Sequence, residues 1–396
     1  MRLSLTRMSK VNLDLLLYYF ITFTIIFDMS IHPFWISIKL SIIGVIILLY
    51  IFYQKVKVNI LLLYVAGFAI LSSVNYIQFY SPGYMFIGAI IYNWIYFFVF
   101  LLILIFIEQL TQNVLPRKHL AITVSLYYIA LVVEYNFLNY VDSVDMFRHI
   151  IVKTQLGTLV VLYLLITEKT RSLKIFYTVI LLGIIYSLSL YQIRSNILAV
   201  VLFFGFFILY NYLEKPVKAL MYSASILLGF GILYIIYNES INEFINGLFW
   251  RFSPLVIGDF SSIDSRLERY MELFQQLGYS YIPYALGNGL GMASWLSTET
   301  KLSSPHSALI GMIHQVGLIG SLLFVIYYLK KVLQALKSEK KEIFFAGAVI
   351  LSSFILSISN DLLFPTIDNF IFFKHMIIYL LLLAIIKDTI RSKREL

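Results

Sequence analysis

The sequence predicts an all-α, polytopic membrane protein, and three observations lead to this fold class. Of the 396 residues, 60% are hydrophobic and 13% are charged, and the mean hydropathy is +0.87. A soluble domain is about 45–50% apolar and about 25% charged. The excess comes in long apolar runs, such as 42–53, 97–107 and 376–386, and one helix needs about 20 such residues to cross a bilayer. This pattern excludes a soluble enzyme, a secreted module and a disordered protein.

Hydropathy and helix-breaking residues together predict a single transmembrane domain over 1–396 with about twelve spans. The spans are expected near 11–27, 34–53, 58–75, 84–107, 119–137, 150–167, 173–191, 194–213, 217–237, 304–329, 342–361 and 366–386. Arg2, Arg7 and Lys10 resemble the basic start of a signal peptide. No small-residue cleavage site follows them, so we expect the first span to be retained.

The distribution of basic residues predicts the orientation. With both termini in the cytoplasm, 21 of the 30 Lys and Arg residues fall in or beside cytoplasmic loops, as the positive-inside rule requires. The net charge of +9 is then a topology signal, and we expect no nucleic-acid partner. Cysteine is absent, which excludes disulfides, thiolate metal sites and a cysteine nucleophile.

One connection, 238–303, is 66 residues long and is predicted to lie outside, between the ninth and tenth spans. Long loops in compact proteins are usually functional or disordered, and the many aromatic residues here argue against disorder. Ser265 and Glu268 form a capping-box pattern ahead of apolar residues at helical spacing. We expect a short amphipathic helix that lies on the membrane surface or against the bundle.

Arg266 and Arg269 fall in the first turns of this expected helix. Cations at a helix N-terminus oppose the macrodipole, an arrangement that makes sense if a bound anion is shared with the free N–H groups. The alternative is a solvated face on which Arg266 or Arg269 pairs with Glu268 or Glu272.

After this helix the chain reads Pro283, Gly287, Gly289 and Gly291, which indicates a tight, backbone-permissive turn. His306 then stands at the predicted start of the tenth span, after Pro305 in the expected first turn. A neutral imidazole there could act as a base, or it could be an interfacial hydrogen-bonding residue. His314, two turns deeper, is expected to be buried and structural.

Arg194 lies in the short outer turn between the seventh and eighth spans, which holds no acidic residue. A charge there either snorkels to water or lipid phosphate or binds a ligand. Lys374 and His375 lie inside the last predicted span, where pairing with Asp361 or Asp368 is the simpler explanation. No histidine has metal-ligand spacing, so we expect no metal and no cofactor.

These residues, in this order, resemble the bacterial O-antigen polymerase and O-antigen ligase superfamily. The shared pattern comprises Arg194, the Arg266-led helix of a large outer loop, the P-x-x-x-G-x-G segment at 283–291, and a span that begins His306-Ser-Ala-Leu and continues V-G-L-I-G at 316–320. The architecture covers most of the chain, and the motifs cover 194–320. Ser307 and Gln315 depart from the Asn and Glu that the family often has.

The resemblance implies a GT-C-like fold and an inverting, metal-independent glycosyltransferase with its active site on the outer face of the bacterial cytoplasmic membrane. Its substrate would be an undecaprenyl-diphosphate-linked oligosaccharide. Guanidinium groups suit phosphate oxygens, so the diphosphate would be bound by Arg194, Arg266 and Arg269. Arg266 and His306 would be catalytic, with His306 deprotonating or orienting the acceptor hydroxyl. Sugars could stack on Trp250, Tyr270 and Trp295. Membrane lipids and a chain-length regulator protein are the other expected partners.

Three functions follow, of which we expect the first. A repeat-unit polymerase would build an O-antigen or capsule-type polysaccharide. A ligase of the same superfamily would move the finished glycan to a lipopolysaccharide core. A flippase of lipid-linked oligosaccharides also has many spans, but it should not need a folded 66-residue outer loop and usually has pseudo-repeated halves.

Overall fold

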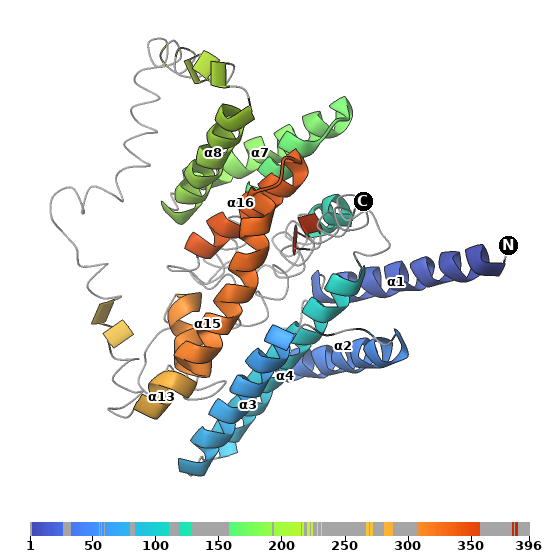
Figure 1. Ribbon diagram of the computed structural model, residues 1–396, viewed down its shortest axis with the longest axis vertical. Coiled ribbons are helices and arrows are strands. Elements are labelled where there is room, and N and C mark those ends of the chain that lie inside the picture. Colours follow the sequence, from blue (N-terminus) through green and yellow to red (C-terminus); the bar gives the residue numbers. More distant parts are fainter. Residues whose placement is uncertain are drawn as a thin grey trace.

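The computed structural model is all-α over the residues that it describes (Figure 1). It describes residues 2–26, 33–54, 56, 58, 60–79, 84–110, 119–127, 158–191, 194–214, 216–217, 220–221, 223–224, 228, 231, 267–268, 270–271, 281–287, 307–356, 382–383 and 385–386. The named helices are α1 (Arg2–Ile26), α2 (Pro33–Gln54), α3 (Ile60–Phe79), α4 (Tyr84–Leu110), α7 (Arg171–Tyr191), α8 (Arg194–Glu214), α13 (Tyr281–Leu286), α15 (Ala308–Leu336) and α16 (Lys341–Leu356). Residues 119–127 and 158–167 are also helical.

Several helices begin and end close to the predicted bounds: α2 matches 34–53, α4 matches 84–107, and α8 matches 194–213. Among the described residues, the segments Ser37–Gln54 and Leu309–Leu336 are long and apolar enough to cross a membrane, by length and composition alone. Two such helices are a weak indication of a membrane protein. The count of twelve spans stays a prediction, because the predicted spans near 217–237 and 366–386 fall largely outside the described residues.

Aromatic rings join the helices at the centre of the molecule. Phe100 of α4 and Phe324 of α15 have ring centroids 6.0 Å apart, and both side chains are buried. Phe345 of α16 lies 5.7 Å from the ring of Phe203 and 5.3 Å from that of Tyr210, both on α8. The core therefore runs continuously from α4 through α15 and α16 to α8, whose helices lie in this order in Figure 1.

Small residues allow the closest helix contacts. A Cβ built on Gly347 of α16 would lie 2.6 Å from the Cβ of Ala335 on α15, so glycine is needed where these two helices begin to separate. The four-residue turn between them is also held by Tyr210 of α8, whose hydroxyl donates to the carbonyl oxygen of Glu339 over 3.2 Å. These contacts tie α8 to the α15–α16 hairpin.

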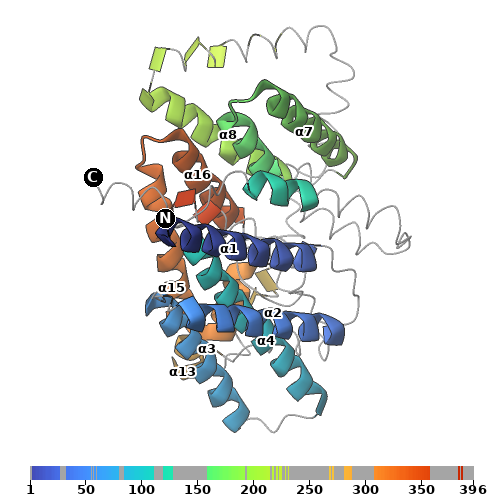
Figure 2. The same ribbon diagram turned by 90° about the vertical axis from the view of Figure 1, so that its right-hand side faces the viewer.

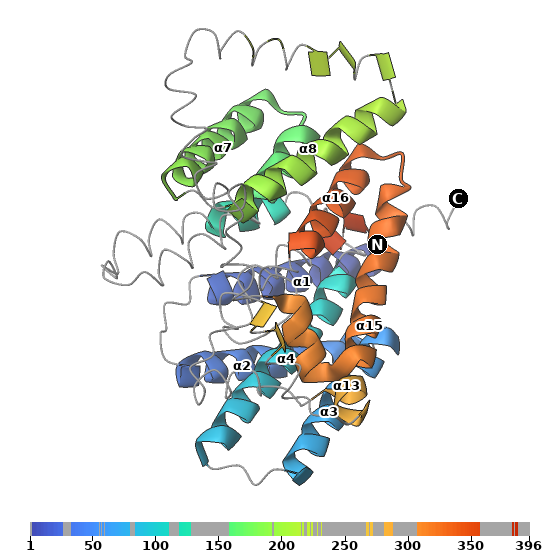
Figure 3. The same ribbon diagram turned by 90° about the vertical axis from the view of Figure 1, so that its left-hand side faces the viewer.

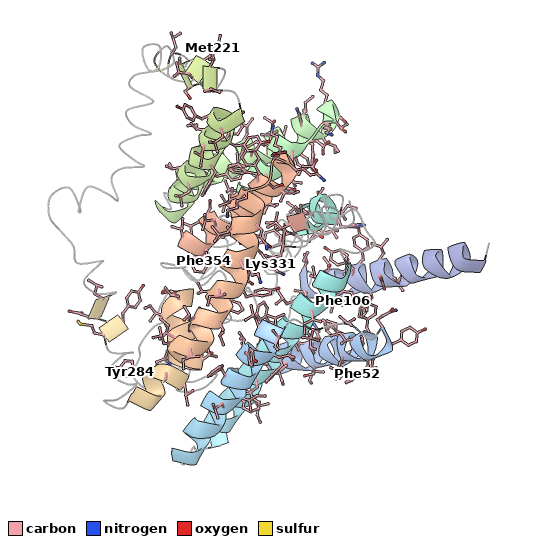
Figure 4. All side chains as sticks on the ribbon, viewed as in Figure 1. Phe52, Phe106, Met221, Tyr284, Lys331 and Phe354 are labelled. Atoms are coloured by element: carbon pink, nitrogen blue, oxygen red, sulfur yellow. The ribbon has the colours of Figure 1, made fainter. Side chains whose placement is uncertain are left out.

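The described helices also carry apolar side chains on their outer faces. On α2, Ile42, Leu49 and Phe52 are 54%, 63% and 71% exposed, and Figure 4 shows the labelled Phe52 at the outside of the molecule. Buried polar side chains accompany these exposed apolar ones: Asp14, Thr22, Ser37, Thr123, Thr158, Thr167, Ser307, His314, Gln315, Ser321, Ser352 and Ser353.

Candidate functional site

The candidate site is organised by a crossing of two backbones at Gly287 and Gly317. A Cβ built on Gly287 would lie 2.4 Å from the backbone nitrogen of Gly317 and 2.6 Å from the carbonyl oxygen of Gln315. A Cβ built on Gly317 would lie 2.2 Å from the carbonyl oxygen of Ala285. Only glycine at both positions permits this approach, so the crossing joins the end of α13 to α15.

The span predicted near 304–329 corresponds to α15, which begins at Ala308 and has a break at Gly317 that was not predicted. Gly317 has φ 72° and ψ 177°, a conformation that essentially only glycine adopts. A Cβ on Gly320 would lie 3.0 Å from that of Val316, whereas residues four apart in a straight helix have Cβ atoms about 5–6 Å apart. We call residues 308–316 the short arm and residues 318–336 the long arm; they meet at a sharp bend beside α13 (Figure 3).

The short arm begins with a cap from Ser307. Its backbone is extended, with φ −147° and ψ 111°, and its hydroxyl accepts a hydrogen bond from the Ile310 N–H over 3.3 Å. Ser307 is fully buried. Serine and asparagine are both favoured N-caps. Ser307 therefore caps this helix as the asparagine that is common at this position in the resembled family could. Pro305 precedes the helix in sequence and is not in its first turn, contrary to the prediction.

The last turn of the short arm carries two buried polar residues. His314 is 2% exposed, in agreement with the expectation of burial, and Gln315 is 1% exposed. Within the described part of the chain, the side-chain oxygen and nitrogen of Gln315 have no hydrogen-bond partner. Leaving such a buried group unsatisfied costs about 1–3 kcal/mol. Gln315 is therefore a buried polar group directly before the crossing, and its side chain has no hydrogen-bond partner in the part of the chain that the structure describes.

Most of the predicted site residues lie outside the described residues: Trp250, Arg266, Arg269, Trp295, His306, Lys374 and His375. Arg194 is the first residue of α8, as predicted from its position at the end of a turn. Tyr270 is half-buried, and residues 267–268 and 270–271, inside the predicted amphipathic helix, are helical. Leu267 and Met271 are 50% and 57% exposed, and the placement of the predicted amphipathic helix, on the membrane surface or against the bundle, stays a prediction.

A second polar cluster was not predicted. The Tyr50 hydroxyl donates to the buried carboxylate of Asp14 over 2.8 Å. The Tyr19 hydroxyl bonds Nδ1 of His119, and Tyr18 bonds Thr123 over 2.5 Å. The cluster therefore joins α1, α2 and the helix at 119–127. The signal in the sequence was Asp14, an acidic residue within the first predicted span.

The described residues hold no group of three His, Asp or Glu side chains that could bind a metal ion. Comparison of the chain with protein-family models, with curated proteins and with solved structures gives no match. Among the described residues, the candidate site comprises the crossing at Gly287 and Gly317, the short arm and the buried Gln315.

Proposed function

We propose that the chain is a polysaccharide polymerase, a glycosyltransferase that joins undecaprenyl-diphosphate-linked repeat units at the outer face of the cytoplasmic membrane. The observation that carries the proposal is the contact between Gly287 and Gly317. It brings residues 285–287, part of the glycine segment predicted at 283–291, against the helix that follows His306 in sequence, and the sequence resemblance rests on both of these segments. A contact between them is what a shared active site requires.

The membrane setting is supported by the location of the polar cluster. Asp14 lies early in the first predicted span, Tyr50 late in the second, and His119 at the start of the fifth. In the predicted topology all three are near the cytoplasmic face, and the structure joins Asp14 to Tyr50 and Tyr19 to His119. These contacts agree with the alternating direction that we predict for spans one, two and five.

In the proposed reaction, a hydroxyl of the acceptor glycan attacks the anomeric carbon of the donor sugar. The new glycosidic bond forms as the bond from that carbon to the diphosphate oxygen breaks, and the electron pair leaves with the diphosphate. Arg194, Arg266 and Arg269 would bind this leaving group and stabilise its charge. His306 would accept the proton of the hydroxyl. The Ser307 cap holds the start of the short arm, which follows His306 in sequence.

The buried Gln315 amide could contribute to this site as a hydrogen-bonding group for a sugar. An amide offers both a donor and an acceptor, which matches neighbouring hydroxyl groups of a sugar ring. Among the described residues the amide has no hydrogen-bond partner, and bound substrate would supply one.

A flippase is the second candidate, because the Asp14–Tyr50 and Tyr19–His119 pairs place ionisable groups inside the bundle, as transporters often do. A ligase would use the same outer site as the polymerase.

The test is to reconstitute the purified chain with lipid-linked repeat units as the only glycan. A ladder of longer lipid-linked glycans supports a polymerase. Product that forms only after a lipid A–core acceptor is added would indicate a ligase. Movement of labelled repeat units across the bilayer without any new linkage would indicate a flippase.

A further inference from the structure

The break in α15 lies beside carbonyl oxygens from two crossing backbones. The carbonyl oxygen of Ala285 lies 2.2 Å from a Cβ built on Gly317. The carbonyl oxygen of Gln315 lies 2.6 Å from a Cβ built on Gly287. Between the described residues of α13 and α15, no backbone hydrogen bond is formed. The crossing therefore brings two carbonyl oxygens together without a donor from the opposite backbone.

Ser321, in the first turn of the long arm, lacks the hydrogen bond that is usual for a hydroxyl group in a helix. A helical serine or threonine commonly donates to the carbonyl oxygen four residues before it. Five hydroxyl groups in the described helices do so over 2.8–2.9 Å, those of Thr24, Ser41, Ser125, Thr167 and Thr178. The buried Ser321 hydroxyl has no hydrogen-bond partner among the described residues. Because helical side chains lean towards the start of their helix, this oxygen lies over the turn that begins at Gly317.

Gln315, two residues before the break, adds a further buried oxygen. Within the described part of the chain, neither polar atom of its amide has a hydrogen-bond partner. Two side-chain oxygens, one from each arm, are thus available beside the two carbonyl oxygens of the crossing. Gln315 and Ser321 are only 1% and 2% exposed, so a ligand that reaches both oxygens has to be small.

The described elements at the break carry no charged side chain. Both α3 and α13 lie beside α15 on one side of the molecule (Figure 2). The sequences of α3, α13 and residues 308–329 contain no Asp, Glu, Lys or Arg. Magnesium and calcium ions are usually bound with carboxylates, and an anion would be repelled by the carbonyl oxygens. Unwound backbone carbonyls and the C-terminal ends of half-helices coordinate sodium ions in membrane transporters, and the short arm is a half-helix that ends at this break.

We propose that the break in α15 binds a sodium ion through the side-chain oxygens of Gln315 and Ser321 and the carbonyl oxygen of Ala285. The ion joins α13 to both arms of α15 and supplies the partner that the two side-chain oxygens otherwise lack. The amide nitrogen of Gln315 is not used and remains available to a sugar, so the inference does not depend on the proposed polymerase activity. A site built from neutral oxygens has no characteristic spacing of His or acidic residues, and for that reason the sequence gives no sign of it.

The experiment measures equilibrium binding of radioactive sodium to the full chain purified in detergent, in buffers that contain choline as the only other cation. The wild type should bind a single ion per chain. Ser321→Ala should weaken binding about tenfold, equivalent to about 1.4 kcal/mol, because it removes one ligand oxygen. Gln315→Met should weaken binding at least as much. The matched control is Ser352→Ala, since Ser352 is also buried and without a partner among the described residues but lies on α16; it should bind sodium as the wild type does.

Sodium should also raise the unfolding temperature of the wild type above its value in choline, because it binds only the folded chain. Absence of saturable sodium binding by the wild type would overturn the proposal. So would wild-type affinity in both Ser321→Ala and Gln315→Met, or an equal loss of affinity in Ser352→Ala. If Ser321→Ala does not fold, Gln315→Met decides in the same assay, and unchanged affinity in that variant contradicts the proposal. A wild type that binds sodium but makes no glycan ladder supports the sodium site and contradicts the polymerase.

Discussion

Gly287 and Gly317, 30 residues apart in the sequence, meet so closely that a Cβ on the first would stand 2.4 Å from the backbone nitrogen of the second. Both have positive φ, 81° and 72°. The contact explains why α15 bends and why α13 ends where it does. The geometry of the candidate site therefore depends on two glycines, which have no side chain that could bind a substrate or react.

Gly317→Ala should destabilise the protein by about 2–4 kcal/mol, because alanine would be strained at this φ and its Cβ would strike the Ala285 carbonyl 2.2 Å away. Thermal unfolding of the purified variant in detergent measures this. Gly67→Ala is the matched control, since Gly67 lies inside α3 with nothing within 4 Å of a Cβ. It should change stability by no more than about 1 kcal/mol, towards greater stability. Equal unfolding temperatures for both variants would contradict the close crossing.

Ser307→Ala should cost about 1 kcal/mol, because the Ile310 N–H loses its hydrogen bond to the serine hydroxyl. Ser307→Asn should retain most of that stability, since asparagine caps equally well. Unfolding curves of the two variants, recorded side by side, test the cap. If Ser307→Asn lowers stability as much as Ser307→Ala does, then the small size of the buried serine, and not its capping hydrogen bond, is what the position requires.

Gln315→Met should raise the unfolding temperature and slow glycan polymerisation. The change removes a buried amide that has no hydrogen-bond partner among the described residues and keeps a similar side-chain volume, so it should stabilise the free protein by about 1 kcal/mol. It also removes the hydrogen bonds that we expect the amide to make to a sugar. Ser352→Ala is the control, because Ser352 is equally buried and unpartnered among the described residues but lies on α16. If Gln315→Met polymerises glycan at the wild-type rate, the Gln315 amide does not contribute to substrate binding.

The apolar runs predicted most of the described helices, because continuous hydrophobic sequence leaves a membrane segment few alternatives to a helix. The break at Gly317 was missed for a related reason. The sequence stays apolar across 309–336, and a glycine inside a helical run usually means no more than a lower helix propensity. Nothing local distinguishes Gly317, which breaks its helix, from Gly67, which does not.

The turn at Gly287 was predicted from its glycine spacing, and its positive φ confirms a glycine-specific conformation at that residue. Its partner could not be predicted, because a contact 30 residues away leaves no periodic pattern. The same applies to Gln315. In the sequence, Gln315 differs from the glutamate that the resembled family often has, and that is all the sequence shows. Its burial, and the absence of hydrogen-bond partners among the described residues, are properties of the folded chain.

Arg194→Lys should reduce polymerisation nearly as much as Arg194→Ala, because lysine keeps the charge but loses the planar fork that binds two phosphate oxygens at once. The ratio of lengthened to single-unit lipid-linked glycan measures the loss, which we expect to be at least tenfold. Arg171, at the start of α7 and exposed, provides a control on the predicted cytoplasmic side, where Arg171→Lys should have no effect. Full activity of Arg194→Lys would show that only charge is needed at that position.

The central claim is tested most directly by the length of the lipid-linked glycan that the reconstituted chain makes from single repeat units. The account predicts a ladder with the wild type, and none with His306→Ala or Arg266→Ala when both variants insert and unfold as the wild type does. Single units alone with the wild type, under conditions in which the donor reaches the outer face, would contradict the polymerase. The same ladder from all three proteins would contradict the proposed site.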